Sequence, residues 1–131
     1  MKPVNKSAKK ILDVLTENVE IEKSKKIDNT NGAFMPVSVE CLGTVNLGTM
    51  FSVTHYGEQN GDLMADPDVV FLKSKDGDYF PCSFRNDYIG VNKEAVIFDG
   101  PEITGFYAKE QADEAVFANQ WMKNIKEQQG L

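Results

Sequence analysis

The sequence has few of the residues that most often carry chemistry. Among its 131 residues are one histidine, one arginine and two cysteines. Cys41 and Cys82 lie too far apart for a zinc ribbon or a CxxC redox motif, and both fall in apolar runs typical of small buried side chains. There is also no glycine-rich phosphate loop, dinucleotide-binding motif or GxSxG motif. No cofactor is therefore predicted, and the common signatures of nucleotide-binding proteins and serine hydrolases are excluded.

Long apolar runs are absent as well. No stretch of about 18 apolar residues occurs that would span a membrane. The N-terminus begins with basic residues, but Asp13, Glu17 and Glu20 interrupt the apolar residues that follow, so the apolar centre of a signal peptide does not form. We therefore expect a cytoplasmic, water-soluble protein that has no membrane partner.

Positive charge is scarce. The net charge is −6 and the isoelectric point is about 4.8, so most of the surface would repel a phosphate backbone and nucleic acid is disfavoured as a partner. The strand aromatics do not form a base-stacking sheet, because such a sheet needs basic residues and Arg85 is the sole arginine. Residues 1–26 differ, since seven lysines and four acids give them a charge of +3. This segment either contacts an acidic partner or is a solvated helix face, and its mixed charges favour the second.

Two segments have the periodicity of amphipathic helices. Apolar residues recur at helical spacing from Ala8 to Val19, which predicts a helix over residues 8–22 with Ser7 as its N-cap. A second, wider stripe from Ala112 to Ile125 predicts a helix over residues 107–127. Both stripes are expected to face a core.

Between these helices, apolar and polar residues alternate as they do in half-buried strands. Strands are predicted over 34–42, 49–56, 68–73 and 79–84, with one long strand or two short ones over 88–98. Asp76-Gly77 is typical of a tight hairpin turn, residues 23–32 are predicted to form a loop, and Asp99–Pro101 is expected to end the strands. We therefore predict a single domain, 1–131, of the α+β class: a central antiparallel sheet of about four to six strands with one N-terminal and one C-terminal helix packed on it.

The segment from Thr54 to Asp68 concentrates polar residues. It holds His55, Glu58, Asp62, Asp66 and Asp68. Carboxylates suit Mg²⁺, Mn²⁺ or Ca²⁺, and a histidine beside acids suits Mn²⁺ or Fe²⁺. The spacing matches neither an EF-hand nor an HExxH zinc motif. The competing interpretation is turn chemistry, because Asn60-Gly61 and Asp66-Pro67 are turn dipeptides.

We predict that Gly57–Pro67 is a loop. Its length of about eleven residues exceeds the two to five of a tight hairpin, and long connections of this kind are usually functional or mobile. The length alone leaves both alternatives open.

His55 by itself could act as a general base. Its phase with Phe51 and Val53 favours a different interpretation, in which the ring lies at the rim of the core. A thiol–imidazole pair with Cys82 is a third alternative, but Cys82 is in phase with Phe80 and is expected to be buried and inert. No catalytic residue is therefore assigned.

Two segments of the chain resemble a known family. HYGEQNGDLMADPDVVF (55–71) and PCSFRNDYIG (81–90) are similar to paired segments of an uncharacterised bacterial domain family. Its members look like small proteins of conjugative elements, plasmids and phages. The resemblance singles out His55, Tyr56, Gln59, Asn60, Gly61, Asp62, Asp66, Pro67, Asn86, Asp87, Tyr88 and Gly90. It implies no activity, because the family has none assigned.

The favoured hypothesis is a small, non-enzymatic accessory protein of a mobile genetic element that binds a protein partner or ligand through the 57–68 loop. One alternative is a small enzyme or metal-dependent domain with a polar site around His55, Asp62 and Asp66. Another is an acidic DNA mimic, for which 20 acids offset by 14 bases are few. The candidate binding residues are His55, Tyr56, Glu58, Gln59, Asn60, Asp62, Asp66, Asp68, Asn86, Asp87 and Tyr88.

Overall fold

The computed structural model describes all residues from 1 to 131 and begins and ends with a helix. The helices are α1 (Lys6–Thr16) and α2 (Ala108–Gln129). The strands are β1 (Ser24–Ile27), β2 (Val37–Val45), β3 (Gly48–Gln59), β4 (Asp62–Ser74), β5 (Tyr79–Asn86), β6 (Val91–Glu94), β7 (Val96–Asp99) and β8 (Glu102–Phe106). The predicted α+β class, with a helix at each end of an antiparallel sheet, is confirmed.

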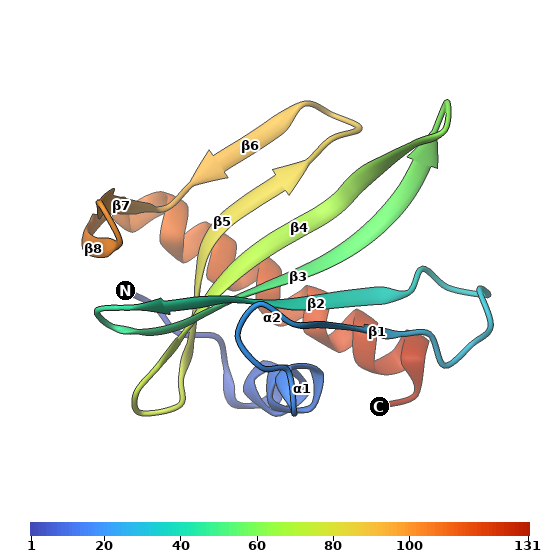
Figure 1. Ribbon diagram of the computed structural model, residues 1–131, viewed down its shortest axis with the longest axis horizontal. Helices are drawn as coiled ribbons and strands as arrows, with labels where there is room; N and C mark the ends of the chain where they lie inside the picture. The colour runs from blue at the N-terminus through green and yellow to red at the C-terminus, as the bar shows by residue number, and fades with distance from the viewer.

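The main sheet is an antiparallel meander. It contains β1 to β6 in the order of the chain, while β7 and β8 form a separate two-stranded sheet. The connections between consecutive strands are short, apart from residues 28–36, which join β1 to β2. The ends of the β3–β4 and β5–β6 hairpins extend beyond the remainder of the sheet (Figure 1).

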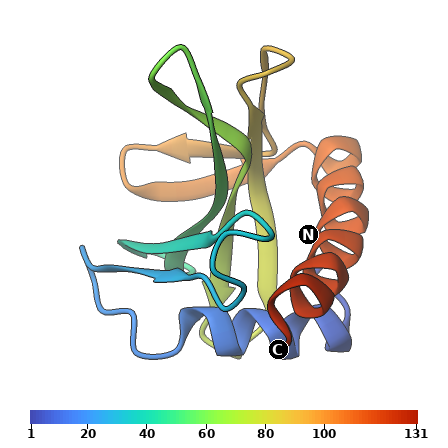
Figure 2. The same cartoon turned by 90° about the vertical axis from the view of Figure 1, so that its right-hand side faces the viewer.

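The two faces of the main sheet are covered differently. The helices pack on one face and the β7–β8 hairpin lies on the other side (Figure 2). On the helix side lies the main core of 17 buried residues, among which Leu12, Phe71 and Met122 are 0% exposed. On the other side, a smaller cluster joins Met50, Leu72, Cys82, Val96 and Ile103. Beyond this cluster the second face has no helix on it, and we refer to this part as the open face.

The helices start and stop at identifiable capping residues. Asn5, rather than Ser7, caps α1 by accepting a 2.8 Å hydrogen bond from the Ala8 N–H. The helix ends at Thr16, earlier than predicted, and Asn18 just beyond it has a left-handed φ of 61°. α2 ends at Gly130, whose φ of 66° is typical of a helix C-cap.

The predicted loop over Gly57–Pro67 is wrong. β3 and β4 continue through this segment and pair as far as Gln59 and Asp62, which leaves Asn60 and Gly61 as a two-residue turn. These two residues have φ values of 53° and 84°, the left-handed conformations that a type I′ turn requires. The acids of the segment are therefore side chains of a long hairpin. The Asn-Gly signal is visible in the sequence, but the polarity of the adjoining residues conceals the strands.

Two more expectations on strand boundaries are wrong, and a third is confirmed in part. The 23–32 segment contains the edge strand β1, whose sequence SKKI lacks a clear apolar alternation. Residues 88–98 hold two short strands, one of the two predicted alternatives, but these strands are separated at Ala95 and belong to two different sheets. The turn after Asp99 leads into β8 instead of ending the strands. These strands have four or five residues each, too few for a periodic pattern to stand out.

Replacing Phe71 tests which face of the main sheet is buried in the main core. Replacing this fully buried side chain by alanine should lower the free energy of unfolding by about 3–5 kcal/mol, because it leaves a cavity in the main core. Leu63→Ala, in the same strand but at a site that is 67% exposed, should change it by less than about 0.5 kcal/mol. Urea denaturation measures both values, and effects of equal size would contradict the assignment.

Candidate functional site

A row of polar side chains crosses the open face. Strand register places Lys26, Ser38, Thr54, Asp68 and Arg85 opposite one another from β1 to β5. The Ser52 hydroxyl donates to Asp68 Oδ1 at 2.9 Å and shares a 3.1 Å hydrogen bond with the Thr54 hydroxyl. The Asp68 carboxylate therefore takes part in holding β3 to β4.

Asp87 ties the end of β5 to β4. Its carboxylate accepts hydrogen bonds from Arg85 Nε at 2.8 Å, from Arg85 Nη2 at 2.9 Å and from the Ala65 N–H at 2.8 Å. The Asp87 N–H in turn donates to the Ala65 carbonyl at 2.9 Å. The hydrogen bond from Arg85 and then that from Ala65 lower the pKa of Asp87 to about 2. Asp87 is thus an ionised residue that fixes the spacing of the two hairpins.

Asn86 and Tyr88 add further contacts between the hairpins. Asn86 Nδ2 donates to Asp66 Oδ1 at 2.9 Å, and Asn86 Oδ1 accepts from the Tyr88 N–H at 3.0 Å. Tyr88 reaches the other hairpin, where its hydroxyl donates to the Glu58 carbonyl at 3.4 Å. A Cβ added at Gly57 would collide with that hydroxyl and lie 3.1 Å from Tyr88 Cζ. The two sequence segments singled out by the family resemblance are therefore in direct contact.

His55 points into the protein. It is 4% exposed and its ring meets Trp121 of α2 edge-on, with 5.3 Å between centroids. A register shift places Asp66 and Pro67 opposite His55, which is a β-bulge. Burial lowers the pKa of His55, while the charge of Asp66 acts in the opposite direction. The strand phase therefore predicted the direction of the ring correctly, and Nε2 has no hydrogen-bond partner there.

The acids and the cysteines do not assemble a metal or thiol centre. No three His, Cys, Asp or Glu side chains are grouped closely enough to hold a metal ion. Cys82 lies in the cluster on the opposite side of the sheet from Trp121, the neighbour of His55. Burial raises the pKa of the Cys82 thiol to about 12, and its Sγ donates to the Phe80 carbonyl at 3.3 Å. The thiol–imidazole pair considered from the sequence is therefore not formed.

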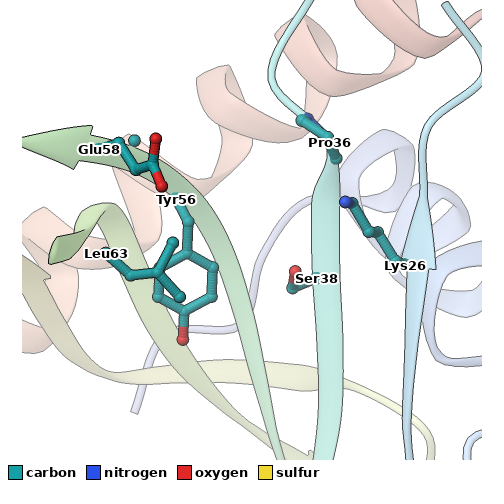
Figure 3. A pocket seen from close by; sticks show the side chains of 7 residues that line it. Lys26, Pro36, Ser38, Tyr56, Glu58 and Leu63 are labelled. Carbon is teal, nitrogen blue, oxygen red and sulfur yellow. The ribbon is translucent and has the colours of Figure 1, made fainter. Parts of the chain in front are cut away.

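A groove opens beside Val37, the first residue of β2, where β3 continues past the β2–β3 ladder. The β2–β3 ladder reaches Val37 and His55, whereas β3 runs on to Gln59 with β4 as its remaining partner. The groove beside this overhang has a volume of about 530 Å³ and is lined by Lys26, Pro36, Ser38, Tyr56, Gly57, Glu58 and Leu63. Figure 3 shows Tyr56, Glu58 and Leu63 on the hairpin side, across from Lys26 and Ser38.

The candidate residues divide into five groups. Tyr56 and Glu58 line the groove. The two hairpins are connected by Asp66, Asn86, Asp87 and Tyr88. Asp68 is hydrogen-bonded within the sheet, and His55 lies inside the protein. The end of the β3–β4 hairpin is formed by Gln59, Asn60 and Asp62. Sequence reasoning missed Leu63, whose apolar side chain within a polar stretch was a usable signal. It also missed Lys26 and Ser38, which reach the groove only through the pairing of β1, β2 and β3.

The structure thus defines a small α+β domain with a polar open face and a groove beside a protruding hairpin. A family model described as a domain of unknown function, DUF6908, matches residues 6–131. The chain therefore belongs to this family, and membership in an uncharacterised domain family is confirmed. Searches of curated proteins and of solved structures gave no match. Neither helix has the length and apolarity that crossing a membrane would require.

Gly57→Ala tests the contact between the hairpins. The added methyl group would meet the Tyr88 hydroxyl, so the variant should unfold at a lower temperature than the wild type. Combining it with Tyr88→Leu should cost less than the sum of the two single changes, because the collision disappears. Gly105→Ala is the matched control, since a Cβ there meets no atom closer than 3.4 Å. Strictly additive melting-temperature changes in the double variant would contradict the contact.

Asp87 should make the free energy of unfolding depend on pH in the acid range. Its pKa is below the ordinary value of 3.8, so the stabilisation is complete above about pH 4 and is lost as the pH falls towards about 2. Asp87→Asn should therefore lower the melting temperature near neutral pH, and the difference from the wild type should shrink over that acid window. Asp99→Asn, at the exposed last residue of β7, is the control. A difference between Asp87→Asn and the wild type that stays constant with pH would refute this role.

Proposed function

We propose that this domain is a non-enzymatic binding module that holds an extended, basic segment of a partner protein in the groove beside the β3–β4 hairpin. The observation that carries the proposal is the groove itself, in which apolar side chains and a strand edge lie together. The family description, which names no activity, is compatible with this role.

Tyr56 and Leu63 supply the apolar part of the binding surface. They are 40% and 67% exposed on a hairpin that Asp87 and Tyr88 hold in place. Exposed aromatic and apolar side chains on a fixed support are typical of binding surfaces, because little side-chain freedom remains to be lost. Such a pair can hold one large apolar side chain of a partner segment.

Glu58 supplies a backbone contact. Opposed residues of an antiparallel ladder alternate between pairs that bond to each other and pairs whose N–H and C=O groups point outward. Gln59 and Asp62 close the two-residue turn and bond to each other, so the backbone of Glu58 points away from β4. The Tyr88 hydroxyl donates to the Glu58 carbonyl. The N–H of Glu58 therefore remains available to an added strand. An extended peptide would continue the sheet where β2 stops.

Charge favours a basic occupant. The hairpin side of the groove carries Glu58, and Asp62 follows at the hairpin end. The chain as a whole carries a net charge of −6, which would attract a basic segment and speed its association. Lys26 on the opposite side would oppose a second basic group, so one basic residue near Glu58 fits best.

The existing contacts of the acids support a role without catalysis. Asp66, Asp68 and Asp87 accept hydrogen bonds from other parts of the fold. His55 is buried with its ring against Trp121. These side chains stabilise the hairpins and the core, so the surface left for recognition is the groove.

We place this module in the bacterial cytoplasm and assign it to a mobile genetic element. This part of the proposal rests on the resemblance of residues 55–71 and 81–90 to proteins of conjugative elements, plasmids and phages. Genes for family members should lie beside transfer, replication or phage genes. Consistent placement among chromosomal housekeeping genes would count against it.

A peptide selection tests the binding role. The probe is a phage-displayed library of random linear peptides, selected on the immobilised full-length protein and followed by calorimetry with the enriched peptides. We expect sequences that combine a large apolar residue with lysine or arginine. Tyr56→Ala should weaken their binding about tenfold or more, as expected for an aromatic anchor. Glu58→Pro should also weaken binding, because proline removes the outward N–H without breaking the backbone hydrogen bonds between β3 and β4.

Tyr107→Ala is the matched control, since Tyr107 is also an exposed tyrosine, 54% exposed, but does not line the groove. Circular dichroism at equal temperature should show that all variants are folded. Failure to enrich any peptide above an uncoated surface would sink the proposal, and so would equal binding to Tyr56→Ala and wild-type protein.

A further inference from the structure

A second, smaller cavity lies between α2 and the β5–β6 edge of the main sheet. It has a volume of about 190 Å³ and is lined by Phe84, Lys93, Glu110, Asp113, Glu114 and Phe117. Half of these residues are acids from the first half of α2. None of them lines the groove described above, so this cavity is separate from the proposed peptide site.

Glu114 is the buried residue of this cavity. It is 5% exposed, and no other acidic residue of the chain is buried. Both of its carboxylate oxygens lack a hydrogen-bond partner. An isolated carboxylate is expensive to bury, and buried charges in proteins are normally paired. The Glu114 carboxyl therefore offers the cavity two acceptor oxygens that no group of the chain occupies.

The electrostatic surroundings of Glu114 are negative. Burial, followed by the nearby charges of Glu110 and Glu94, raises the pKa of Glu114 to about 8, and Lys93 opposes this to a lesser extent. Lys93 forms no salt bridge with any of these acids, and Cys82 of β5 is kept neutral by a pKa raised to about 12. A positively charged group that entered the cavity would relieve this repulsion.

The walls of the cavity are aromatic. The rings of Phe84 and Phe117 meet edge-on, with centroids 5.0 Å apart. Aromatic rings beside a carboxylate suit an organic cation, which gains from both the charge and the ring electrons. The cavity is also smaller than the roughly 300–1,000 Å³ of sites for drug-sized ligands, and so suits a single alkyl chain. The lack of three grouped ligand side chains argues against a metal ion.

We propose that this cavity binds an alkylammonium group, from a lysine side chain or a free polyamine, which pairs with Glu114 beside the rings of Phe84 and Phe117. Phe117 is 37% exposed and the Lys93 side chain is exposed, so rotation of side chains at the rim gives access without a backbone movement. Binding requires the carboxylate form of Glu114, because the cation and the proton compete for the same oxygens. Affinity should therefore rise with pH and level off above about pH 8.

NMR titration of the full-length protein tests the site. The probe is n-butylammonium chloride, with sodium chloride at equal ionic strength as the reference and with carbon-13 detection of the Glu114 carboxyl. We expect a saturable shift of this signal, a lower pKa of Glu114 in the bound protein, and tighter binding at about pH 9 than at about pH 6. Parallel titrations with spermidine and with a blocked lysine amide distinguish a free polyamine from a protein side chain.

Variants make the assignment specific. Glu114→Gln should weaken binding about tenfold or more, as expected on loss of a charged partner. Lys93→Gln should strengthen binding, because it removes a competing cation. Glu127→Gln is the control, since Glu127 is an exposed acid of the same helix that does not line the cavity. The absence of a saturable shift, or equal affinities for wild type and Glu114→Gln, would overturn the proposal.

Discussion

The ladder between β3 and β4 is the constraint on which the rest of the structure depends. Side chains alternate between its two faces, so Val53 and Phe71 enter the main core while Ser52 and Asp68 face outward. A shift of one residue in this ladder would exchange the two faces. The bulge opposite His55 shifts the β3–β4 register once. His55 also pairs with Val37, the first residue of β2.

Both candidate binding regions lie beside an edge of the main sheet. The groove exists because β3 is longer than β2, which leaves Tyr56 and Glu58 beside an edge that no strand of the chain completes. The second cavity lies between the first half of α2, which carries Glu114, and strands β5 and β6. By comparison, the largest side chains of the main core are fully buried. The two proposed binding sites therefore lie at the margins of the sheet.

The helix–sheet interface contains two buried groups that are not fully paired. His55 Nε2 and the Glu114 carboxylate both lie between α2 and the sheet without hydrogen-bond partners. Burial shifts the two pKa values in opposite directions, and in each case it favours the neutral form. His55 has the ring of Trp121 against it, which makes it a packed core residue. Glu114 lines a cavity instead, which is why it suggests a ligand.

The sequence predicted the helices, the antiparallel sheet and the inward direction of His55, because these depend on local periodicity. It failed at the segment from Gly57 to Pro67, where acidic side chains on both faces removed the apolar alternation that marks a strand. Asn60-Gly61 is the one local signal of the two-residue turn within this segment. Lys26 and Glu114 were out of reach, because the first joins the groove through strand pairing and the second is buried by elements distant in sequence.

Amide hydrogen exchange along β3, measured by NMR, tests the central claim that this strand has an open edge beside the groove. The account predicts slow exchange at Gly57 and Gln59, whose N–H groups face β4, and fast exchange at Glu58, whose N–H faces the groove. A bound peptide should slow the exchange of Glu58 and leave Gly57 and Gln59 unchanged. Protection of Glu58 in the free protein equal to that of its two neighbours would contradict the account.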